Sequence, residues 1–261
     1  MNTVTIARDA VAVRPVSTPA LLAAEARAEL LKAWRQPAYV IPTLTLPLAF
    51  YALFGIVLAP PGSGNAGYLL ATFGVFAGLG PSLFGFGAAV ADERARGILS
   101  LKQVSPLPVG VFLGAKLVTA LAFTLLVLVG LYALAALWGG VALPRGAWLA
   151  LAAIHLASVV PFCLMGLCIG LLLPSSAAMG VTNLVFMALA VLGGLWIPIM
   201  LFPQWMQAIG GALPTYHVAA LALAAAGRNP SVQPLLHVTV LAVTAAVFAA
   251  IAWRAWRAAG R

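Results

Sequence analysis

Charge is what this sequence lacks most. Only 7% of its 261 residues are charged, whereas 64% are hydrophobic, and a soluble domain carries about 25% charged residues. So few charges cannot cover a water-facing surface, and we therefore expect lipid to surround most of the chain. In lipid every backbone N–H and C=O has to be hydrogen-bonded within the protein, which restricts spanning segments to helices or closed barrels. The apolar runs are long and continuous rather than alternating, and this pattern favours helices.

Ionisable groups are absent from most of the apolar runs. All five acids fall outside them: Asp9, Glu25, Glu29, Asp92 and Glu93. Ion-coupled carriers usually need an ionisable relay inside the membrane, so this scarcity argues against a carrier of that kind. His155 is the one deep candidate, and a lone membrane histidine is more typical of a helix-to-helix hydrogen bond than of a proton site.

Several chemical motifs are missing as well. The sequence has no HExxH metal pair and no GxSxG nucleophile turn, so we expect neither a metal site nor an intramembrane enzyme. It also has no GxxxxGK[ST] phosphate loop, so a separate chain would have to bind any ATP that drives this protein. Cys163 and Cys168 lie five residues apart, on different faces of a helix, which suits neither a disulfide nor a metal pair.

The net charge of +9 has a membrane explanation rather than a nucleic-acid one. Binding to nucleic acid needs a basic stripe on a soluble face, whereas the basic residues here form short clusters between apolar runs. Such clusters orient a protein in the bilayer because cytoplasmic loops are enriched in Lys and Arg. We therefore expect a membrane lipid environment and no nucleic-acid partner.

The N-terminal part divides into a tail and a helix. Residues 1–17 are mixed in composition, and we predict a flexible cytoplasmic tail. Residues 18–37 begin with Thr-Pro, a helix-start signal, and place apolar and charged residues on opposite faces. This pattern predicts an amphipathic helix at the membrane interface, marked by Leu30, Trp34 and Arg35.

Residues 38–261 are predicted to form a six-span transmembrane domain. The apolar runs are each long enough to cross the hydrocarbon core of about 30 Å, and they cover residues 39–59, 68–91, 111–137, 148–173, 177–197 and 235–253. In the second run Gly74 and Gly78 have the spacing that lets a neighbouring helix approach closely. In the third, Lys116 is able to extend from the first turns toward the interface.

Residues 198–234 combine features of a membrane span with features of a loop. Residues 208–226 are apolar enough to resemble a span, but Gly210, Gly211 and Pro214 interrupt them. If this segment is a re-entrant extracellular hairpin, only Arg145 and Arg228 of the fourteen basic residues lie outside. That bias follows the positive-inside rule. The predicted fold is therefore an all-α membrane protein with six transmembrane helices, this hairpin before the last span, and both termini cytoplasmic.

The loop between the second and third runs carries a family resemblance. It reads ADERARGILSLKQVSPLPVGVFLGAKL and includes Glu93-Arg94, Gly97, Leu99, the turn Ser105-Pro106-Leu107, and Gly114 with Lys116. This order resembles the cytoplasmic loop of type-2 ATP-binding-cassette (ABC) exporter permeases. Two departures are visible, because Ile98 stands where Thr is common and Ser100 stands where an acid is common.

Two further stretches agree with that resemblance. LLKAWRQP looks like the helix that leads into the first span of the family, with its Arg-x-Pro ending. GGLWIPIMLFPQWMQAIGGALPTYH is similar to the family's extracellular stretch after the fifth span. By this resemblance the residues of an extracellular gate or cap are Pro198, Pro203, Trp205, Pro214 and Tyr216.

The resemblance implies a function and a set of partners. It implies a permease of the bacterial inner membrane that pairs with a second copy of itself or a homologous permease, and with two ABC ATPase subunits. ATP and Mg would bind those subunits, since no cofactor is expected in this chain. The substrate would be hydrophobic or amphipathic (a drug, a lipid-linked molecule or a glycolipid), moved outward by alternating access.

The same resemblance assigns the contact with the ATPase to the charged loop. The expected coupling residues are Asp92, Glu93, Arg94, Arg96, Gly97, Leu99 and Leu101. In this view Gly97 allows a close approach that a side chain would block. Two alternatives remain at this point. The loop could be only a solvated, orientation-setting segment, and the whole chain could be a non-transporting membrane scaffold or assembly factor.

Overall fold

A computed structural model describes residues 17–60, 63–104 and 107–259, and within them every regular element is a helix. Residues 1–16 of the predicted tail, and Ser105 and Pro106 of the predicted turn, lie outside the described residues. In chain order the elements are α1 (Thr18–Trp34), α2 (Pro37–Tyr51), the π-helix η1 (Ala52–Val57), α3 (Asn65–Phe86), α4 (Ala88–Ala95), α5 (Ile98–Val104), α6 (Val109–Leu137), α7 (Arg145–Ala157), α8 (Val159–Leu172), α9 (Ser175–Leu192), the 3-10 helix η2 (Ile199–Leu201), α10 (Gln204–Gly211), α11 (Pro214–Ala225) and α12 (Pro234–Ala259).

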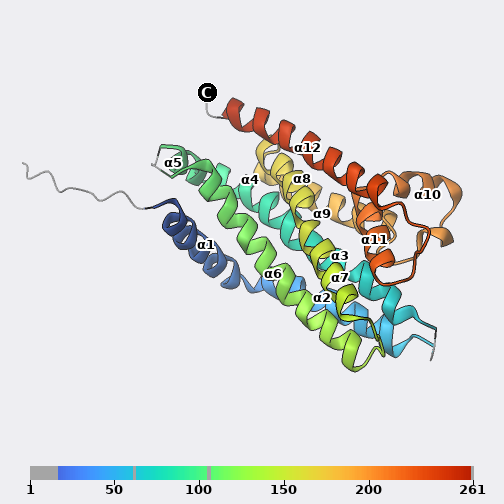
Figure 1. Cartoon of the computed structure of the whole chain (residues 1–261). Coiled ribbons are helices and arrows are strands. Elements are labelled where there is room, and N and C mark those ends of the chain that lie inside the picture. Colours follow the sequence, from blue (N-terminus) through green and yellow to red (C-terminus); the bar gives the residue numbers. More distant parts are fainter. Residues whose placement is uncertain (1–16, 61–62, 105–106, 260–261) are drawn as a thin grey trace, which may run out of the picture.

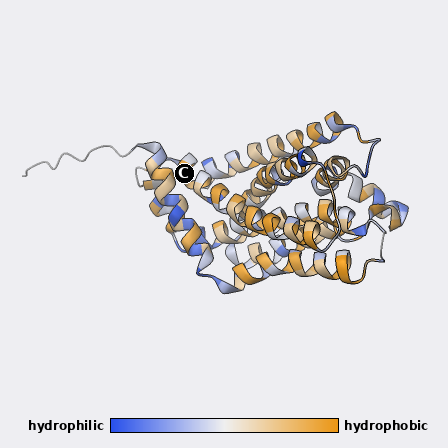
Figure 2. Ribbon diagram, turned by 60° about the horizontal axis from the view of Figure 1, so that its bottom comes forward, coloured by the Kyte–Doolittle hydropathy of each residue, from blue (hydrophilic) through white to orange (hydrophobic). Residues whose placement is uncertain are grey.

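Within the described residues, six helical segments are long and apolar enough to cross a membrane. They are Pro37–Val57, Asn65–Ala95, Val109–Leu137, Arg145–Leu172, Ser175–Leu192 and Pro234–Ala258. Figure 1 shows them running side by side along one axis, and Figure 2 shows apolar residues over most of their length. The predicted six-span, all-α membrane fold is therefore confirmed.

α3 lies at the centre of the bundle. It packs against α2, α6, α8, α9 and α11, and most of its side chains are buried. Its glycines permit this crowding. A Cβ on Gly78 would contact Val159 and Thr124 at 3.4 and 3.5 Å, so the predicted close helix approach is present.

His155 is held between three helices. Its Nε2 lies 2.9 Å from the carbonyl oxygen of Ala71 on α3, and its Nδ1 lies 2.9 Å from the hydroxyl of Tyr132 on α6. The ring is fully buried and fills the space that Gly74 leaves open, since a Cβ there would come within 2.1 Å of the ring. The predicted helix-to-helix hydrogen bond is confirmed.

The segment before the last span bends sharply. α10 and α11 are bent by 86° at a short break, and Figure 1 shows them at one end of the bundle, opposite α5. Thr215 donates a hydrogen bond to the carbonyl oxygen of Leu189 at 2.8 Å, which fixes the start of α11 on the end of α9. We call this end of the bundle, with η2, α10 and the start of α11, the hairpin end.

Candidate functional site

The predicted coupling loop forms a two-helix corner at the opposite end of the bundle. α4 continues from α3 across Gly87, and α5 follows after a tight turn at Gly97. Gly97 has φ +73°, a left-handed conformation that glycine adopts without strain. Among the described residues, apart from its two neighbours in the chain, no atom lies within 4 Å of where its Cβ would stand. The turn itself therefore explains this glycine, and a close approach to a partner stays a prediction.

A cluster of buried charges ties this corner to its neighbours. Lys116 of α6 lies 2.9 Å from Glu93 of α4 and 3.1 Å from Glu29 of α1. Lys32 of α1 forms ion pairs with the same two carboxylates, at 2.8 Å to Glu29. Glu29, Glu93 and Lys116 are each less than 10% exposed. One interlocked set of ion pairs thus joins α1, α4 and α6.

The cluster extends to α5 through Lys102. Its ammonium group pairs with Glu25 and lies 3.9 Å from Glu29. It also lies over the ring of Phe112 at 4.6 Å, a cation–π distance. We call Glu25, Glu29, Lys32, Glu93, Lys102 and Lys116 the charge cluster. Three carboxylates and three ammonium groups balance, which makes burial tolerable because each charge has an opposite partner.

The electrostatic balance is visible in the two α1 members. Burial alone would raise the pKa of Glu29, but the charges of Lys116 and Lys32 outweigh burial and leave its pKa below the ordinary value. Burial alone would lower the pKa of Lys32, and Glu93 and Glu29 instead raise it. Both groups are therefore held in their charged forms by the opposite charges around them.

Arg94 binds backbone carbonyl groups rather than the carboxylates of the charge cluster. Its guanidinium donates hydrogen bonds to the carbonyl oxygens of Leu171 and Leu173. These carbonyls end α8, where the helix has no backbone donor left to satisfy them. Arg94 therefore caps the fourth span and links it to α4.

The predicted coupling residues divide by orientation. Glu93 and Arg94 point into the protein, and Leu99 is 2% exposed in a core with Phe112. Asp92 and Arg96 form an exposed ion pair at 3.0 Å. Ile98, Leu101 and Val104 of α5 turn outward, and Leu101 and Val104 are 68% and 84% exposed. The inward residues hold the corner in place, whereas the outward ones are free to meet another molecule.

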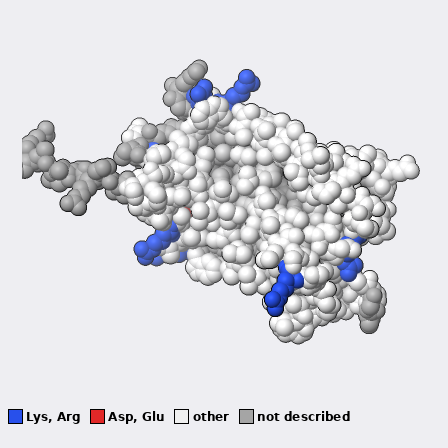
Figure 3. Space-filling view, in the orientation of Figure 1, with Lys and Arg blue, Asp and Glu red and all other residues white. Residues whose placement is uncertain are grey.

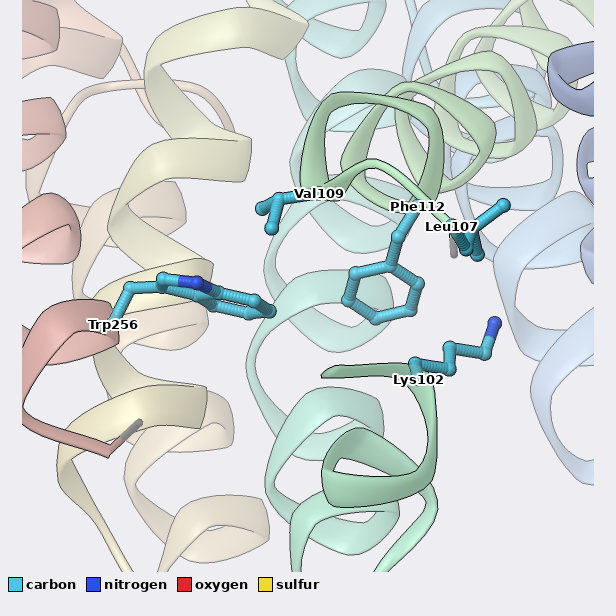
Figure 4. A pocket seen from close by; sticks show the side chains of 5 residues that line it. All are labelled: Lys102, Leu107, Val109, Phe112 and Trp256. Carbon is cyan, nitrogen blue, oxygen red and sulfur yellow. The ribbon is translucent and has the colours of Figure 1, made fainter. Parts of the chain in front are cut away.

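The last helix closes over the same corner. Figure 4 shows Trp256 of α12 directed toward Phe112 of α6, with Lys102 on the far side of the Phe112 ring. The two aromatic ring centroids are 6.3 Å apart. The cavity between them is only about 10 Å³, room for a single water. This hollow is a packing defect rather than a substrate site.

The predicted interfacial helix has an unexpected orientation. α1 turns steeply relative to the helices that follow it (Figure 2), and its acidic side faces α6 rather than water. Trp34 is 57% exposed and lies 6.1 Å from the ring of Phe123. Leu30 is half-buried, and Arg35 ends the helix in an exposed position. The placement of α1 at a membrane interface stays a prediction.

The predicted gate or cap residues gather at the hairpin end. Pro198 and Pro203 immediately precede η2 and α10, and Pro214 is the first residue of α11. Trp205 is 64% exposed. Tyr216 lines a cavity of about 130 Å³ between α3, η2 and α11, too small for a whole drug-sized molecule.

Sequence reasoning missed two features. Lys116 was expected to extend toward the interface, but it is 4% exposed because Glu29 and Glu93 surround its ammonium group. The second is a pair of histidines, His217 of α11 and His237 of α12, with Nδ1 atoms 2.8 Å apart. The spacing of Glu25, Glu29 and Lys32 on one face of a helix was a signal for the first feature. Nothing in the sequence signals the second.

Comparison with known proteins finds a family match that covers most of the residues described above. A family profile described as "ABC-2 type transporter" matches residues 21–226, which include the charge cluster and the hairpin. The YvfS protein of Bacillus subtilis (strain 168), provisionally named a transport permease, is 30% identical over 193 residues. That alignment covers 73% of this chain and 79% of the relative.

Proposed function

The chain belongs to the ABC-2 type transporter family, and from this premise we propose that it is the membrane-spanning subunit of an exporter driven by a separate ABC ATPase. As a member of that family it is a transport permease and not itself the catalyst. Two ATPase subunits, and a second permease that is a copy or a homologue, would complete the transporter. ATP and Mg would bind the ATPase subunits.

One observation carries the proposal: α5 is an exposed apolar helix that charged contacts join to the neighbouring helices. α5 presents Ile98, Leu101 and Val104 outward, next to the exposed pair of Asp92 and Arg96. Exposed apolar side chains with a polar rim are typical of a protein–protein contact. The outward residues of the predicted coupling set are therefore available to a groove on the ATPase.

The charged contacts beneath α5 explain how a displacement of α5 could be transmitted to the spans. α5 is joined to α1 through Lys102, α4 to α1 and α6 through Glu93, and α4 to α8 through Arg94. Each link is charged and part-buried, so breaking one leaves an uncompensated charge. A displacement of the corner would then carry α1 and the second, third and fourth spans as packed bodies, the usual form of domain motion.

The nature of the substrate follows from what the spans offer. Leaving aside tyrosines, cysteines and the arginines near the ends of spans, His155 and His237 are the ionisable side chains that the described spans carry outside the charge-cluster end of the bundle. Both ring nitrogens of His155 are hydrogen-bonded to neighbouring helices. Spans with so few ionisable side chains provide few groups that could bind a charged solute. We propose a hydrophobic or amphipathic substrate, such as a drug, a lipid-linked molecule or a glycolipid, moved outward by alternating access in the bacterial inner membrane.

The test replaces an exposed leucine at each end of the bundle. Leu101→Ser alters α5, and Leu201→Ser alters an equally exposed leucine (70%) at the hairpin end. Each variant is co-purified with a span-free P-loop ATPase encoded in a neighbouring open reading frame. Burying a leucine contributes about 1.5–3 kcal/mol, so Leu101→Ser should weaken the complex about 10- to 100-fold, and Leu201→Ser should leave it intact.

Transport separates the exporter from a scaffold. Proteoliposomes that hold both chains should hydrolyse ATP faster when a hydrophobic dye is present, and should move that dye across the bilayer. A complex that forms normally but shows neither effect with a panel of such dyes would favour the non-transporting scaffold. Full ATPase binding by Leu101→Ser would instead remove α5 from the contact.

A further inference from the structure

The C-terminal turns of α12 have two different faces. Trp256 turns inward, against Phe112 of α6 (Figure 4). Trp253, Arg254 and Arg257 turn outward, and Trp253 is 56% exposed. The guanidinium of Arg257 lies over the indole ring of Trp253, 4.5 Å from its centroid. One face therefore anchors the helix, while the other presents a stacked arginine and a second arginine.

These arginines have no acidic counterpart among the described acids. Glu25, Glu29 and Glu93 are taken up by the charge cluster, and Asp92 pairs with Arg96. Figure 3 shows the result on one face of the molecule, where basic side chains lie over the end of α12, over α1 and toward the opposite end of the bundle, with almost no acidic surface. The end of α12 thus exposes two positive charges that the described part of the chain leaves uncompensated.

The outward face is continuous with an apolar stripe. Val243, Val247 and Ile251 follow at four-residue intervals and are all exposed, which places them on one side of the helix. Only 11% of the α12 span is buried inside the chain. A helix face that is apolar along its length, and ends in tryptophan and arginine, is oriented toward lipid tails and then toward headgroups.

We infer that Trp253, Arg254 and Arg257 form a binding site for the phosphate of an anionic phospholipid headgroup. The planar guanidinium of arginine matches the oxygen spacing of a phosphate and donates to it in pairs. Trp253 keeps Arg257 extended by stacking on it, and its indole suits the headgroup level. Acyl chains would continue along Ile251, Val247 and Val243.

This site differs from the proposed coupling contact and does not rest on it. The ATPase would meet α5, whereas Arg254 follows Val247 by seven residues and Arg257 follows Val243 by fourteen, spacings that place both arginines on the side of α12 that carries the apolar stripe. An acidic surface of a protein partner could neutralise the arginines, but it would leave the stripe unexplained. Lipid accounts for both features at once.

The test uses the full chain purified in detergent and follows its unfolding temperature. Short-chain phosphatidylglycerol is titrated against phosphatidylcholine with the same acyl chains. Phosphatidylglycerol should raise the unfolding temperature more, and added salt should weaken the effect because it screens charges. Each arginine near a membrane surface is worth about fivefold in binding, so Arg254→Gln with Arg257→Gln should raise the half-stabilising concentration about 25-fold.

Two matched pairs of variants control the result. Arg145→Gln with Arg228→Gln removes the same charge at the hairpin end and should leave the titration nearly unchanged. Arg254→Lys with Arg257→Lys keeps the charge but loses the planar, paired donors, so it should recover only part of the effect; this pair also covers the case that the glutamine pair fails to fold. Stabilisation by inorganic phosphate equal to that by the lipid would overturn the inference, as would an unchanged titration in the glutamine pair. Loss of ATPase binding by that pair with lipid binding intact would assign the arginines to the partner protein.

Discussion

At the scale of single residues, His155 shows how a polar side chain is kept inside a membrane span. A backbone carbonyl can only accept a hydrogen bond, so Nε2 of His155 carries the proton that is donated to Ala71. Nδ1 then accepts from the Tyr132 hydroxyl. This arrangement describes a neutral ring with both nitrogens satisfied, which explains why it needs no acid nearby.

Gly74 makes room for that ring, and this leads to the first prediction. Gly74→Ala would place a methyl group 2.1 Å from the imidazole, and overpacking of this kind destabilises by about 1–3 kcal/mol. Thermal unfolding of the purified protein should show the loss. Gly80→Ala on the same helix is the control, since its Cβ would meet only Phe186, at 3.9 Å. Equal stability of the two variants would contradict the close fit at His155.

At this scale the role of His155 could be predicted from the sequence, whereas that of Lys116 could not. A single histidine in an apolar run has few options, so its role was predictable. Lys116 stands at the start of a span, where extension to water and burial among carboxylates are both possible. Only the fold brings Glu29 and Glu93, which are 64 residues apart in sequence, to the same ammonium group.

The second prediction concerns pH and Glu29. Its pKa lies below the ordinary value of 4.5, so its ionised form is favoured more in the folded chain than in the unfolded one. That contribution is fully present above pH 4.5 and is lost as pH falls through the lower, folded-state value. The wild-type unfolding temperature should therefore exceed that of Glu29→Gln at neutral pH and converge on it in acid. A difference that stays constant across this range would mean that the ion pairs of Glu29 do not stabilise the fold.

At the scale of elements, the helices were predictable and their orientation was not. Hydropathy and the Thr-Pro start located α1, but the helix turns its acidic side toward α5 and α6 because Lys102 and Lys116 pair with it there. Likewise, the sequence indicates a charged loop without showing which charges face inward. Periodicity defines the faces of a helix, whereas long-range partners decide which face is buried.

The third prediction tests whether the charge cluster binds α4 to α6. Lys116→Met leaves two buried carboxylates with one fewer partner, and breaking a buried pair costs about 3–5 kcal/mol. Glu93→Gln should also destabilise. The double variant removes one charge of each sign, so its loss should be smaller than the sum by about 0.5–3 kcal/mol. Unfolding measurements on the four proteins give this coupling energy.

An exposed ion pair provides the matched control for that cycle. Asp92 and Arg96 are both on the surface, at 3.0 Å, and such pairs contribute at most about 1 kcal/mol. Arg96→Gln should therefore change the unfolding temperature little. Strict additivity of Lys116→Met and Glu93→Gln would show that the two side chains do not act together.

At the scale of the whole molecule, membrane thickness made the six spans predictable. A span needs about 20 apolar residues, and few other segments of this chain have that length. α11 has 12 residues and α10 has eight, which at about 1.5 Å per residue gives lengths of roughly 18 and 12 Å. Neither helix alone crosses about 30 Å of hydrocarbon, and the bend of 86° between them is typical of a re-entrant hairpin or of a broken span.

The last prediction follows from where the hairpin begins and ends. Its far end returns to the start of α3, since the Arg228 guanidinium packs so closely on Gly67 that a Cβ there would lie 2.6 Å away. Gln204 starts the hairpin beyond the end of α9, so we expect both ends on one side of the membrane. Cysteines placed at Gln204 and Arg228 should therefore both react with an impermeant external reagent. Reporter fusions should report the outside at Gly64, and the cytoplasm at Ser175 and after Arg261. An external C-terminus, or protection of one of the two cysteines, would mean that the hairpin crosses the membrane as a seventh span.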